Sequence, residues 1–476
     1  MNQLDARTLV LGKAFPPSWR RVHQSRSAPM ALLAAFSNLI EDYFPLSMGI
    51  VQWLRTLLGA KPGEATTSEP KLTTTVLIVG AGSTGLALAQ GLKKAHIPCV
   101  LLERQSSIGS HPRDWNMGLH WGAESLKSLI PDELWKQIQS VQVDPSISPS
   151  KSDALNFING STGENMASIP APFFNRLRRR KLRELLATGL DVRYDKRVQG
   201  INFSKDGQYA TVRLTDETSL TAKIVIGADG ARSTIRQLML PQTGQIRPLP
   251  YCATFVQARF SAERARFLRQ FHPLYLAGIN PAGQFAFFGM HEVEDPDRPE
   301  SWTFFFYISW QSTYQEQERT ADWSNAQRLT QVKEFARQFA DPWKSAFQWL
   351  DDDHEVWYMG LTDFDPGAQD HRWDNHGGRV TLAGDAAHAM TYQRGQGLNH
   401  SITDAAYLVE AIQRFVSGVE PQSTAVTEYE DEMIARAGGE VRLSTLNTEL
   451  VHDWENVLQS PVLTSGMKKH SSQGLL

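Results

Sequence analysis

The sequence predicts an α/β fold in which a βαβ domain is interleaved with an antiparallel sheet and followed by C-terminal helices. Two observations support the βαβ part: a glycine-rich turn follows an apolar stretch at residues 72–79, and a Gly-Asp turn follows residues 380–383. Short aromatic segments between residues 250 and 310 indicate the antiparallel sheet. A chain of 476 residues is long for one domain, so we expect two closely joined domains.

The first glycine-rich turn has the order of residues that a phosphate-binding turn needs. Residues 72–79 are rich in Val, Ile and Thr, which is typical of a buried parallel strand. Gly80 permits a tight turn, Gly82 lets the backbone approach a pyrophosphate, and Gly85 lets the following helix pack close to the strand. The free N–H groups at the start of that helix, predicted over residues 83–95, favour phosphate. The predicted site residues here are Gly80, Gly82, Ser83, Thr84 and Gly85.

The next strand, predicted over residues 97–102, ends beside an acidic residue. Glu103 then lies where it can bind the ribose hydroxyls of a dinucleotide, and the adjacent Arg104 is assigned to the same site. A glycine-rich turn without a ligand is the alternative interpretation. The combination of strand, helix and acidic residue favours a dinucleotide, but it does not separate NAD from FAD.

Two later segments also place an aspartate after a strand. Residues 224–236 contain Asp229 directly before a glycine, and residues 380–388 contain Asp385 at the carboxyl end of a strand, where open α/β sheets bind ligands. His388 follows closely, and we interpret it as a hydrogen-bonded packing residue rather than a catalytic base.

A helix predicted over residues 398–415 follows a second pair of glycines. Gly395 and Gly397 open this helix, and its first turn contains Leu398 and Asn399. The N–H groups at its N-terminus can stabilise negative charge on a ligand. These four residues are therefore assigned to the same cofactor site.

Together the three segments resemble the flavoprotein monooxygenases of the para-hydroxybenzoate and salicylate hydroxylase type, over roughly residues 71–442. The resemblance implies a Rossmann-like FAD-binding domain, with Asp229 near the phosphates and Asp385 near the ribityl chain and pyrophosphate. It also implies that the helix opened by Gly397 faces the flavin pyrimidine. Tyr392 and Ala389 stand where the family often has prolines, which leaves that loop less restrained.

The resemblance implies further cofactor contacts in two arginine-containing segments. It places Arg113 and Gly118 near the isoalloxazine and the ribityl chain, with a solvated surface role as the alternative for Arg113. It also places either Arg179 or Arg180 against the flavin or its phosphates. The neighbouring charges are then a solvated helix face.

The predicted antiparallel sheet has strands at residues 251–260, 276–279, 285–291 and 303–310. In the family such a sheet forms the substrate wall over the flavin ring. Ordinary sheet core is the alternative for these side chains, and no dedicated acid or base is identified. The candidate substrate contacts are Phe287, Phe288, Met290, Phe304 and Phe306.

Composition excludes several other classes of protein. The net charge is −3 with both signs spread along the chain, which argues against a nucleic-acid partner. Cys99 and Cys252 have neither a CxxC nor a metal-binding spacing, so we expect no metal, and Cys99 is expected to be a small buried strand residue. No second GxGxxG follows a strand, so NADPH or NADH is expected to bind transiently over the flavin.

We expect residues 1–70 to form an extension and linker, and residues 71–248 to form the first part of the FAD domain with interleaved substrate-side strands. Residues 249–375 are expected to form the substrate domain, and residues 376–476 the second part of the FAD domain, with the Gly-Asp turn, and the C-terminal helices. Residues 31–59 are apolar at helical spacing but contain Glu41, Asp42 and Pro45, which argues against a membrane-spanning helix. This segment is expected either to pack on the core or to lie on a surface as an amphipathic helix. For residues 1–30 a transit peptide is the alternative to an unstructured N-terminus, and the expected location is the cytoplasm.

The predicted function is an FAD-dependent monooxygenase that uses NAD(P)H and O2 to hydroxylate or epoxidise an aromatic or olefinic small molecule of fungal secondary metabolism. One alternative is an oxidase, reductase or cyclase of the same fold that transfers no oxygen. Another is a non-catalytic binding protein with the FAD fold. The substrate, its regiochemistry and the oligomeric state do not follow from the sequence.

Overall fold

The computed structural model describes residues 72–110 and 113–467. Contacts divide the chain into two units, Met1–Glu69 and Pro70–Leu476. The predicted extension, its apolar segment at residues 31–59 and most of the linker lie outside the described residues.

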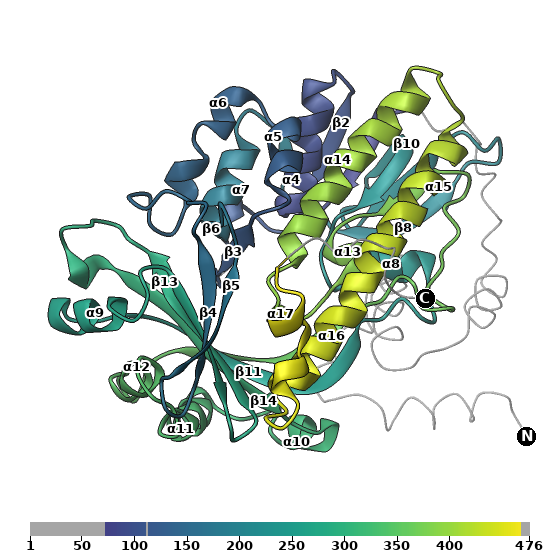
Figure 1. The fold of residues 1–476 in the computed structure, drawn as a ribbon. Helices are drawn as coiled ribbons and strands as arrows, with labels where there is room; N and C mark the ends of the chain where they lie inside the picture. The colour runs from purple at the N-terminus through teal and green to yellow at the C-terminus, as the bar shows by residue number, and fades with distance from the viewer. Residues whose placement is uncertain (1–71, 111–112, 468–476) are drawn as a thin grey trace, which may run out of the picture. The chain divides into compact units, whose positions relative to one another are not determined.

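The first sheet has the predicted βαβ unit at its centre (Figure 1). β1 pairs in parallel with β2 on one side and with β10 on the other, and β10 pairs in parallel with β16. The predicted strands and helix are confirmed with slightly different ends, and Cys99 begins β2 half-buried rather than buried. The elements are β1 (Thr74–Val79), α4 (Ser83–Lys94), β2 (Cys99–Leu102), β7 (Val192–Arg193), β8 (Val198–Phe203), β9 (Ala210–Leu214), β10 (Ser219–Gly227) and β16 (Val380–Leu382).

The second sheet is mostly antiparallel, in the order β15-β11-β14-β13-β12-β4-β5. The four predicted aromatic strands are β11, β12, β13 and β14, so the predicted fold class is confirmed. The strands are β4 (Ala154–Asn159), β5 (Asn165–Pro170), β11 (Arg247–Arg259), β12 (Tyr275–Asn280), β13 (Gln284–Glu292), β14 (Thr303–Gln311) and β15 (Val356–Asp363). A separate two-stranded sheet joins β3 (Asn116–Leu119) to β6 (Asn175–Arg178).

Helices cover one face of the second sheet (Figure 1). Because successive strand residues point to opposite faces, one set of side chains packs under these helices and the other set faces β3, β6 and the C-terminal segments. Both sets are apolar, so each face has a core of its own. The helices on this side are α9 (Ala262–Arg269), α10 (Tyr314–Arg319), α11 (Asn325–Ala336) and α12 (Trp343–Gln348).

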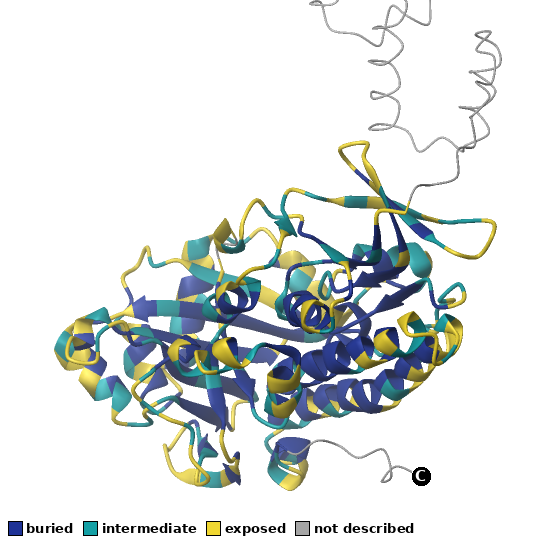
Figure 2. Ribbon diagram, turned by 90° about the horizontal axis from the view of Figure 1, so that it is seen from above, coloured by how far each residue is buried: buried dark blue, intermediate teal, exposed yellow. Residues whose placement is uncertain are grey.

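The C-terminal part is helical, and its longest helix lies against the first sheet's helix α4 (Figure 1). The predicted helix at residues 398–415 is α14 (Gly397–Val416), and most of its length is buried, as Figure 2 shows. A π-helical turn at Ile434–Gly438 joins the two helices that follow. These are α15 (Gln422–Met433) and α16 (Gly439–Val451), and α17 (Pro461–Thr464) comes after them.

The remaining elements in the described part of the chain are short helices and turns. They are α5 (Ala123–Leu129), α6 (Asp132–Trp135), α7 (Arg179–Ala187), α8 (Thr234–Met239) and α13 (Asp385–His388), with 3-10 turns at Ile108–Ser110, Ile138–Val141, Pro299–Ser301 and Val457–Gln459. Within residues 72–110 and 113–467, none of the helices combines the length and the apolar character that a membrane span needs.

Candidate functional site

The glycine-rich turn between β1 and α4 combines two tightly packed glycines with one open position. A Cβ atom on Gly80, where φ is +109°, would lie 2.4 Å from the carbonyl oxygen of Ala228. A Cβ on Gly85 would lie 2.0 Å from the carbonyl oxygen of Gly80. A Cβ on Gly82 would meet no protein atom closer than 3.9 Å. Gly80 and Gly85 are therefore required for packing, whereas Gly82 leaves space for a ligand.

The N-terminus of α4 offers unpaired N–H groups to this space. Gly82 is the N-cap residue, and no side chain caps the helix. The first turn contains Ser83 and Thr84 and no acidic residue. An uncapped helix start of this kind suits an anion such as a pyrophosphate.

Glu103, which directly follows β2, forms a hydrogen bond with the glycine-rich turn. Its Oε2 accepts a hydrogen bond from the N–H of Ala81 at 2.9 Å, and its Oε1 accepts one from the N–H of Gln105 at 2.9 Å. Each carboxylate oxygen retains acceptor capacity for the ribose hydroxyls of a dinucleotide. Arg104, the next residue, is exposed.

Arg179, at the start of α7, contributes an unpaired positive charge near Glu103 and Asp385. Its guanidinium lies over the Trp115 ring at 4.3 Å and has no hydrogen bond or ion pair with any described residue. Its pKa is lowered to about 10, mainly by desolvation and also by the charge of Arg183, whereas the charges of Asp114, Asp385 and Glu103 oppose this. The backbone N–H of Arg180 donates to Asp114, and the cofactor contact of Arg179 or Arg180 stays a prediction.

Asp385, at the end of β16, is the acidic counterpart of Arg179. Its carboxylate is exposed and accepts no hydrogen bond from a described residue. Desolvation by the surrounding protein raises its pKa, and the charges of His388, Arg179 and Arg236 oppose this increase. Gly384 precedes it with φ +63°, and a Cβ there would lie 2.5 Å from Oγ1 of Thr84. The Gly-Asp turn thus lies directly against the first turn of α4.

Asp229 lies at the end of β10, but its carboxylate binds its own segment. Oδ1 accepts a hydrogen bond from Oγ of Ser233 at 2.5 Å, and Oδ2 accepts one from the N–H of Thr234 at 2.7 Å. Arg236, one turn later, is fully buried and donates to the carbonyl oxygen of Ala386 at 2.8 Å. This segment therefore holds the Gly-Asp turn in place, and a direct contact of Asp229 with the phosphates stays a prediction.

Asn399 in the first turn of α14 binds the segment that contains Gly118. Its Oδ1 accepts hydrogen bonds from the N–H groups of His120 and Gly122, at 3.0 and 3.1 Å. Its Nδ2 donates to the carbonyl oxygen of Gly118 at 3.1 Å. The helix itself has no side-chain cap, so its first N–H groups remain available beside Leu398. Arg113, on the same segment as Gly118, is exposed.

A buried ion network that the sequence did not predict supports the Gly-Asp turn. Oδ2 of Asp404 accepts hydrogen bonds from the N–H of Gly384 at 2.7 Å and pairs with Nε2 of His388 at 2.6 Å. Nη2 of Arg436 donates to Oδ1 of Asp404 at 2.7 Å. His388 is thus a hydrogen-bonded packing residue, as predicted. Asp404 and Arg436 belong to no motif, and their signal in the sequence is limited to charge within apolar helices.

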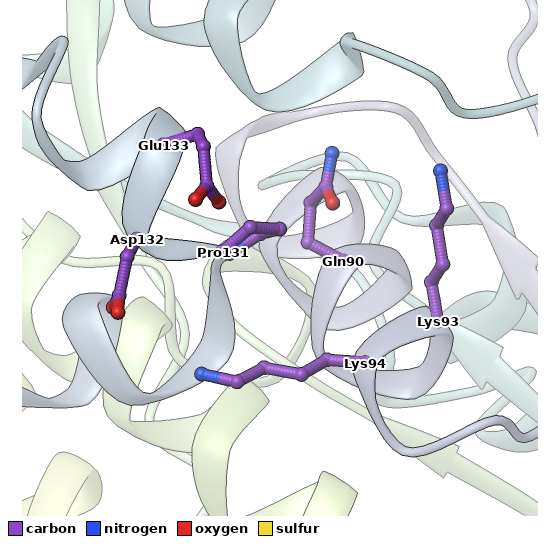
Figure 3. A pocket seen from close by; sticks show the side chains of 6 residues that line it. All are labelled: Gln90, Lys93, Lys94, Pro131, Asp132 and Glu133. Carbon is purple, nitrogen blue, oxygen red and sulfur yellow. The ribbon is translucent and has the colours of Figure 1, made fainter.

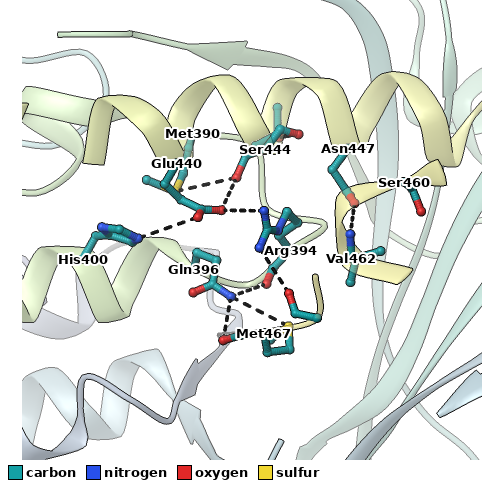
Figure 4. A network of polar contacts seen from close by, with 12 residues as sticks. Met390, Arg394, Gln396, His400, Glu440, Ser444, Asn447, Ser460, Val462 and Met467 are labelled. Atoms are coloured by element: carbon teal, nitrogen blue, oxygen red, sulfur yellow. Dashed lines mark hydrogen bonds and ion pairs between the residues drawn. The ribbon is translucent and has the colours of Figure 1, made fainter. Parts of the chain in front are cut away.

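A second network ties the loop before α14 to α16 (Figure 4). Nη1 of Arg394 lies 3.3 Å from Oε1 of Glu440, and both side chains are almost fully buried. Nε2 of Gln396 donates to the carbonyl oxygens of Arg394 and Met467. Gly395, with φ +63°, lies between these anchors. The loop is therefore held at both ends although the family's prolines are absent.

The predicted substrate residues fall on two different faces of the second sheet. Phe287 is half-buried and packs with the core that faces β6 and the loop before α14. The other four lie at most 3% exposed in the core under α9, α11 and α12, because their positions alternate with those on the site face. Helix-side packing is therefore their role, and the expectation of substrate contacts is corrected for Phe288, Met290, Phe304 and Phe306.

The site face instead presents aromatic residues that the sequence analysis did not identify. Tyr307 and Phe255 lie on this face, and the Tyr392 ring of the loop before α14 stands edge-on to both, at centroid distances of 5.2 and 5.6 Å. Trp357 stacks on Phe255 at 5.6 Å. An apolar aromatic wall therefore meets the loop that carries Gly395.

A pocket of about 350 Å³ lies elsewhere, between α4 and α6 (Figure 3). Gln90 and Lys94 line it, and their side-chain nitrogens already donate to backbone carbonyl oxygens. It lies at the C-terminal end of α4, away from the glycine-rich turn, and we assign it no role. No cluster of metal-ligating side chains occurs in the described part of the chain.

Comparison with known proteins agrees with this geometry. The family model of the FAD binding domain matches residues 73–444. The FAD-dependent monooxygenase cctM of Talaromyces islandicus is 36% identical over 399 residues, which cover 83% of this chain and 98% of that protein. The FAD-dependent monooxygenase phnB of Penicillium herquei is 33% identical over 397 residues, which cover 83% and 95%.

Solved structures share the fold at low sequence identity. Klebsiella pneumoniae HpxO, complexed with FAD and uric acid, matches with a TM-score of 0.64 and 18% identity over 83% of this chain and 92% of that one. CtdE, complexed with FAD and a substrate, matches with a TM-score of 0.66 and 15% identity over 84% and 96%. The chain therefore belongs to the FAD-binding family of flavoprotein monooxygenases, and it is an FAD-dependent monooxygenase.

Proposed function

We propose that this enzyme uses NADPH or NADH and O2 to insert one oxygen atom into an electron-rich aromatic or olefinic carbon of a fungal secondary metabolite. For a hydroxylation the balance is substrate, O2, NAD(P)H and one proton giving hydroxylated product, NAD(P)⁺ and water. FAD supplies the hydride acceptor and the reductant of O2 when it is bound. The protein's part is binding, orientation and exclusion of water.

The residues present fit FAD. The open position at Gly82, the uncapped start of α4 and the unpaired guanidinium of Arg179 suit a pyrophosphate. Glu103, beside the glycine-rich turn, would bind the adenosine ribose, and Asp385 would bind the ribityl chain. The uncapped start of α14 then supports negative charge on the reduced flavin.

The observation that carries the proposal is the aromatic wall beside this cofactor site. The Tyr307 and Phe255 rings contact Tyr392 of the loop before α14, and Trp357 stacks on Phe255. An aromatic or olefinic substrate packs favourably against such a surface.

Labelled dioxygen tests the reaction. The FAD-loaded enzyme is incubated with NADPH or NADH, candidate aromatic and olefinic compounds, and ¹⁸O-labelled O2, and product mass is measured. One labelled oxygen atom in the product supports the proposal. Substrate-dependent NAD(P)H consumption with an unlabelled product would instead identify an enzyme of this fold that transfers no oxygen.

Asp385→Ala is expected to weaken FAD binding by about tenfold or more, because it removes the carboxylate acceptor proposed to bind the ribityl chain. The dissociation constant is measured by fluorescence titration of the apoprotein with FAD. Asp352→Ala removes a carboxylate whose side chain is fully exposed and is the matched control. Equal affinities for the two variants would remove Asp385 from the cofactor site.

Flavin reduction is expected to be faster when substrate is bound. The described residues contain no second dinucleotide domain, so the nicotinamide shares access to the flavin with the substrate. Gly395, with φ +63°, lies between the two anchors of the neighbouring loop and is the position expected to allow the backbone movement that gating needs. Anaerobic stopped-flow measures flavin bleaching by NAD(P)H with the substrate, without it, and with an aromatic compound that is not turned over. The same rate in all three mixtures would reject gating.

A further inference from the structure

Arg176 on β6 has a guanidinium without a polar partner among the described residues. Its Nε is shielded from solvent and forms no hydrogen bond, and no ion pair compensates its charge there. The guanidinium carbon lies 4.8 Å from the centroid of the Phe287 ring. A cation–π contact attracts the charge of the guanidinium but accepts no hydrogen bond from Nε, so the ring does not compensate the group fully.

Two other arginines near the site have acceptors within the chain. Arg178, two residues further along, donates from Nε to Oδ2 of Asp114 at 2.9 Å and also pairs with Glu292. Arg183 donates from Nε to the carbonyl oxygen of Ala81 at 3.0 Å. The guanidinium groups of Arg176 and Arg179 have no such acceptor among the described residues, and Arg179 is the one proposed to face the cofactor.

Two tyrosine hydroxyls share this environment. Tyr307 on β14 stacks at 5.7 Å on Phe287, the ring that Arg176 contacts, and both Tyr307 and Tyr275 on β12 raise the pKa of Arg176. Neither hydroxyl forms a hydrogen bond with a described residue. Burial raises the pKa of both phenols, so they remain protonated and able to donate. Desolvation lowers the pKa of Arg176 to about 10, so it remains charged at neutral pH. Three donors therefore lie together without an acceptor.

These donors lie between the cofactor segments and the aromatic wall. Arg176 is paired in register with Gly118, whose carbonyl oxygen accepts from Asn399 in the first turn of α14. The Tyr307 ring contacts Tyr392 of the loop before that helix. A ligand held by Arg176 would thus be in reach of the cofactor and of the wall together.

We propose that Arg176, assisted by the hydroxyls of Tyr275 and Tyr307, binds an oxygen anion on an aromatic substrate, either a carboxylate or a phenolate. The planar guanidinium matches such an oxygen anion, and Phe287 supplies an aromatic face beside it. Arg176 is then a specificity-determining residue of the proposed oxygenation, and this assignment rests on the proposed function in taking the ligand to be its substrate.

Ligand binding tests this subsite without turnover. The FAD-loaded full chain is titrated with benzoate and with benzamide, and the change in flavin absorbance gives the two dissociation constants. We expect benzoate to bind about 10- to 100-fold more tightly. Arg176→Gln should abolish this preference, whereas Arg176→Lys should retain part of it because the charge remains. Arg259→Gln, which removes an exposed arginine from β11, should leave the preference unchanged.

A second probe distinguishes a phenolate from a carboxylate. para-Nitrophenol reports its own ionisation by absorbance, and the wild-type enzyme should bind the ionised form preferentially if phenolates are the natural ligands. Tyr307→Phe removes one donor without removing the ring and should weaken binding of whichever anion is preferred. FAD content of each variant, measured after denaturation, shows that the site is intact.

Equal binding of benzoate and benzamide by the wild-type enzyme, or no binding of either, would overturn the assignment. An unchanged preference in Arg176→Gln with full FAD content would do the same. The outcome is independent of oxygen transfer: loss of the preference together with an unlabelled product would keep the subsite and reject the oxygenation. A labelled product with an unchanged preference would keep the oxygenation and reject the subsite.

Discussion

Replacing Gly85 with alanine is expected to destabilise the protein by about 3 kcal/mol, even in the absence of FAD. The new Cβ would lie 2.0 Å from the carbonyl oxygen of Gly80, and both groups belong to backbone that is packed between β1 and α4. Alanine within a helix gains at most about 1 kcal/mol over glycine, so the steric clash determines the sign. Urea unfolding of the apoprotein measures the effect.

Gly82→Ala should have the opposite effect: stability should hardly change, whereas FAD binding should weaken. The nearest protein atom would be 3.9 Å from the new Cβ, and φ is −73°, so the unfolding free energy should hardly change. FAD affinity should fall by about tenfold or more, because the methyl group enters the space assigned to the pyrophosphate. Gly109→Ala, where a Cβ meets nothing within 4 Å, controls for the loss of a glycine. Wild-type FAD affinity in Gly82→Ala would contradict the assigned position of the cofactor.

Asp404→Asn is expected to cost about 3 kcal/mol of unfolding free energy at neutral pH, because it removes the buried one of the two carboxylates that pair with Arg436 and leaves only Glu432, which is partly exposed. Burial alone would raise the pKa of Asp404, but the charges of His388 and Arg436 and their hydrogen bonds hold it below its usual range. The contribution of Asp404 is therefore complete above the unfolded-state pKa of about 4 and is lost as the pH falls through the lower folded-state pKa.

The pH dependence separates this charge effect from a packing defect. The difference in unfolding free energy between wild type and Asp404→Asn should be constant from pH 7 to about pH 4 and decrease below it. Glu294→Gln is the matched control, since it breaks the exposed ion pair with Arg259, and should cost less than about 1 kcal/mol. Similar losses in the two variants, or a difference that persists in acid, would exclude the proposed role of the Asp404 network.

The local features of the fold could be predicted because they depend on residues close in sequence. The tight turn at Gly80 and the close approach at Gly85 constrain only a few consecutive residues. The spacing of the glycines was therefore enough to predict the βαβ unit. The four aromatic strands were recognisable from their composition and from the turns between them. The cofactor followed from the combination of this unit with the later Gly-Asp turn.

Which face of the second sheet meets the cofactor was decided by tertiary structure. Phe287 and Phe288 are adjacent and equally apolar, and both faces of the sheet are buried, so alternation alone does not distinguish them. Helices pack on the face that contains Phe288, so Phe287 lies with Tyr307 on the other face. The hydrogen-bond partners of buried polar groups were also decided by tertiary structure, because they lie far apart in the sequence.

By itself, the sequence determined the fold class, the FAD-binding turn and the enzyme family, because each is encoded in short motifs with fixed backbone requirements. Only the tertiary structure decided that Asp404 supports the Gly-Asp turn and that Arg176 has no described acceptor. These outcomes depend on which side chains meet after the chain has folded. Hydrogen-bond partners separated by tens or hundreds of residues leave no local pattern to recognise.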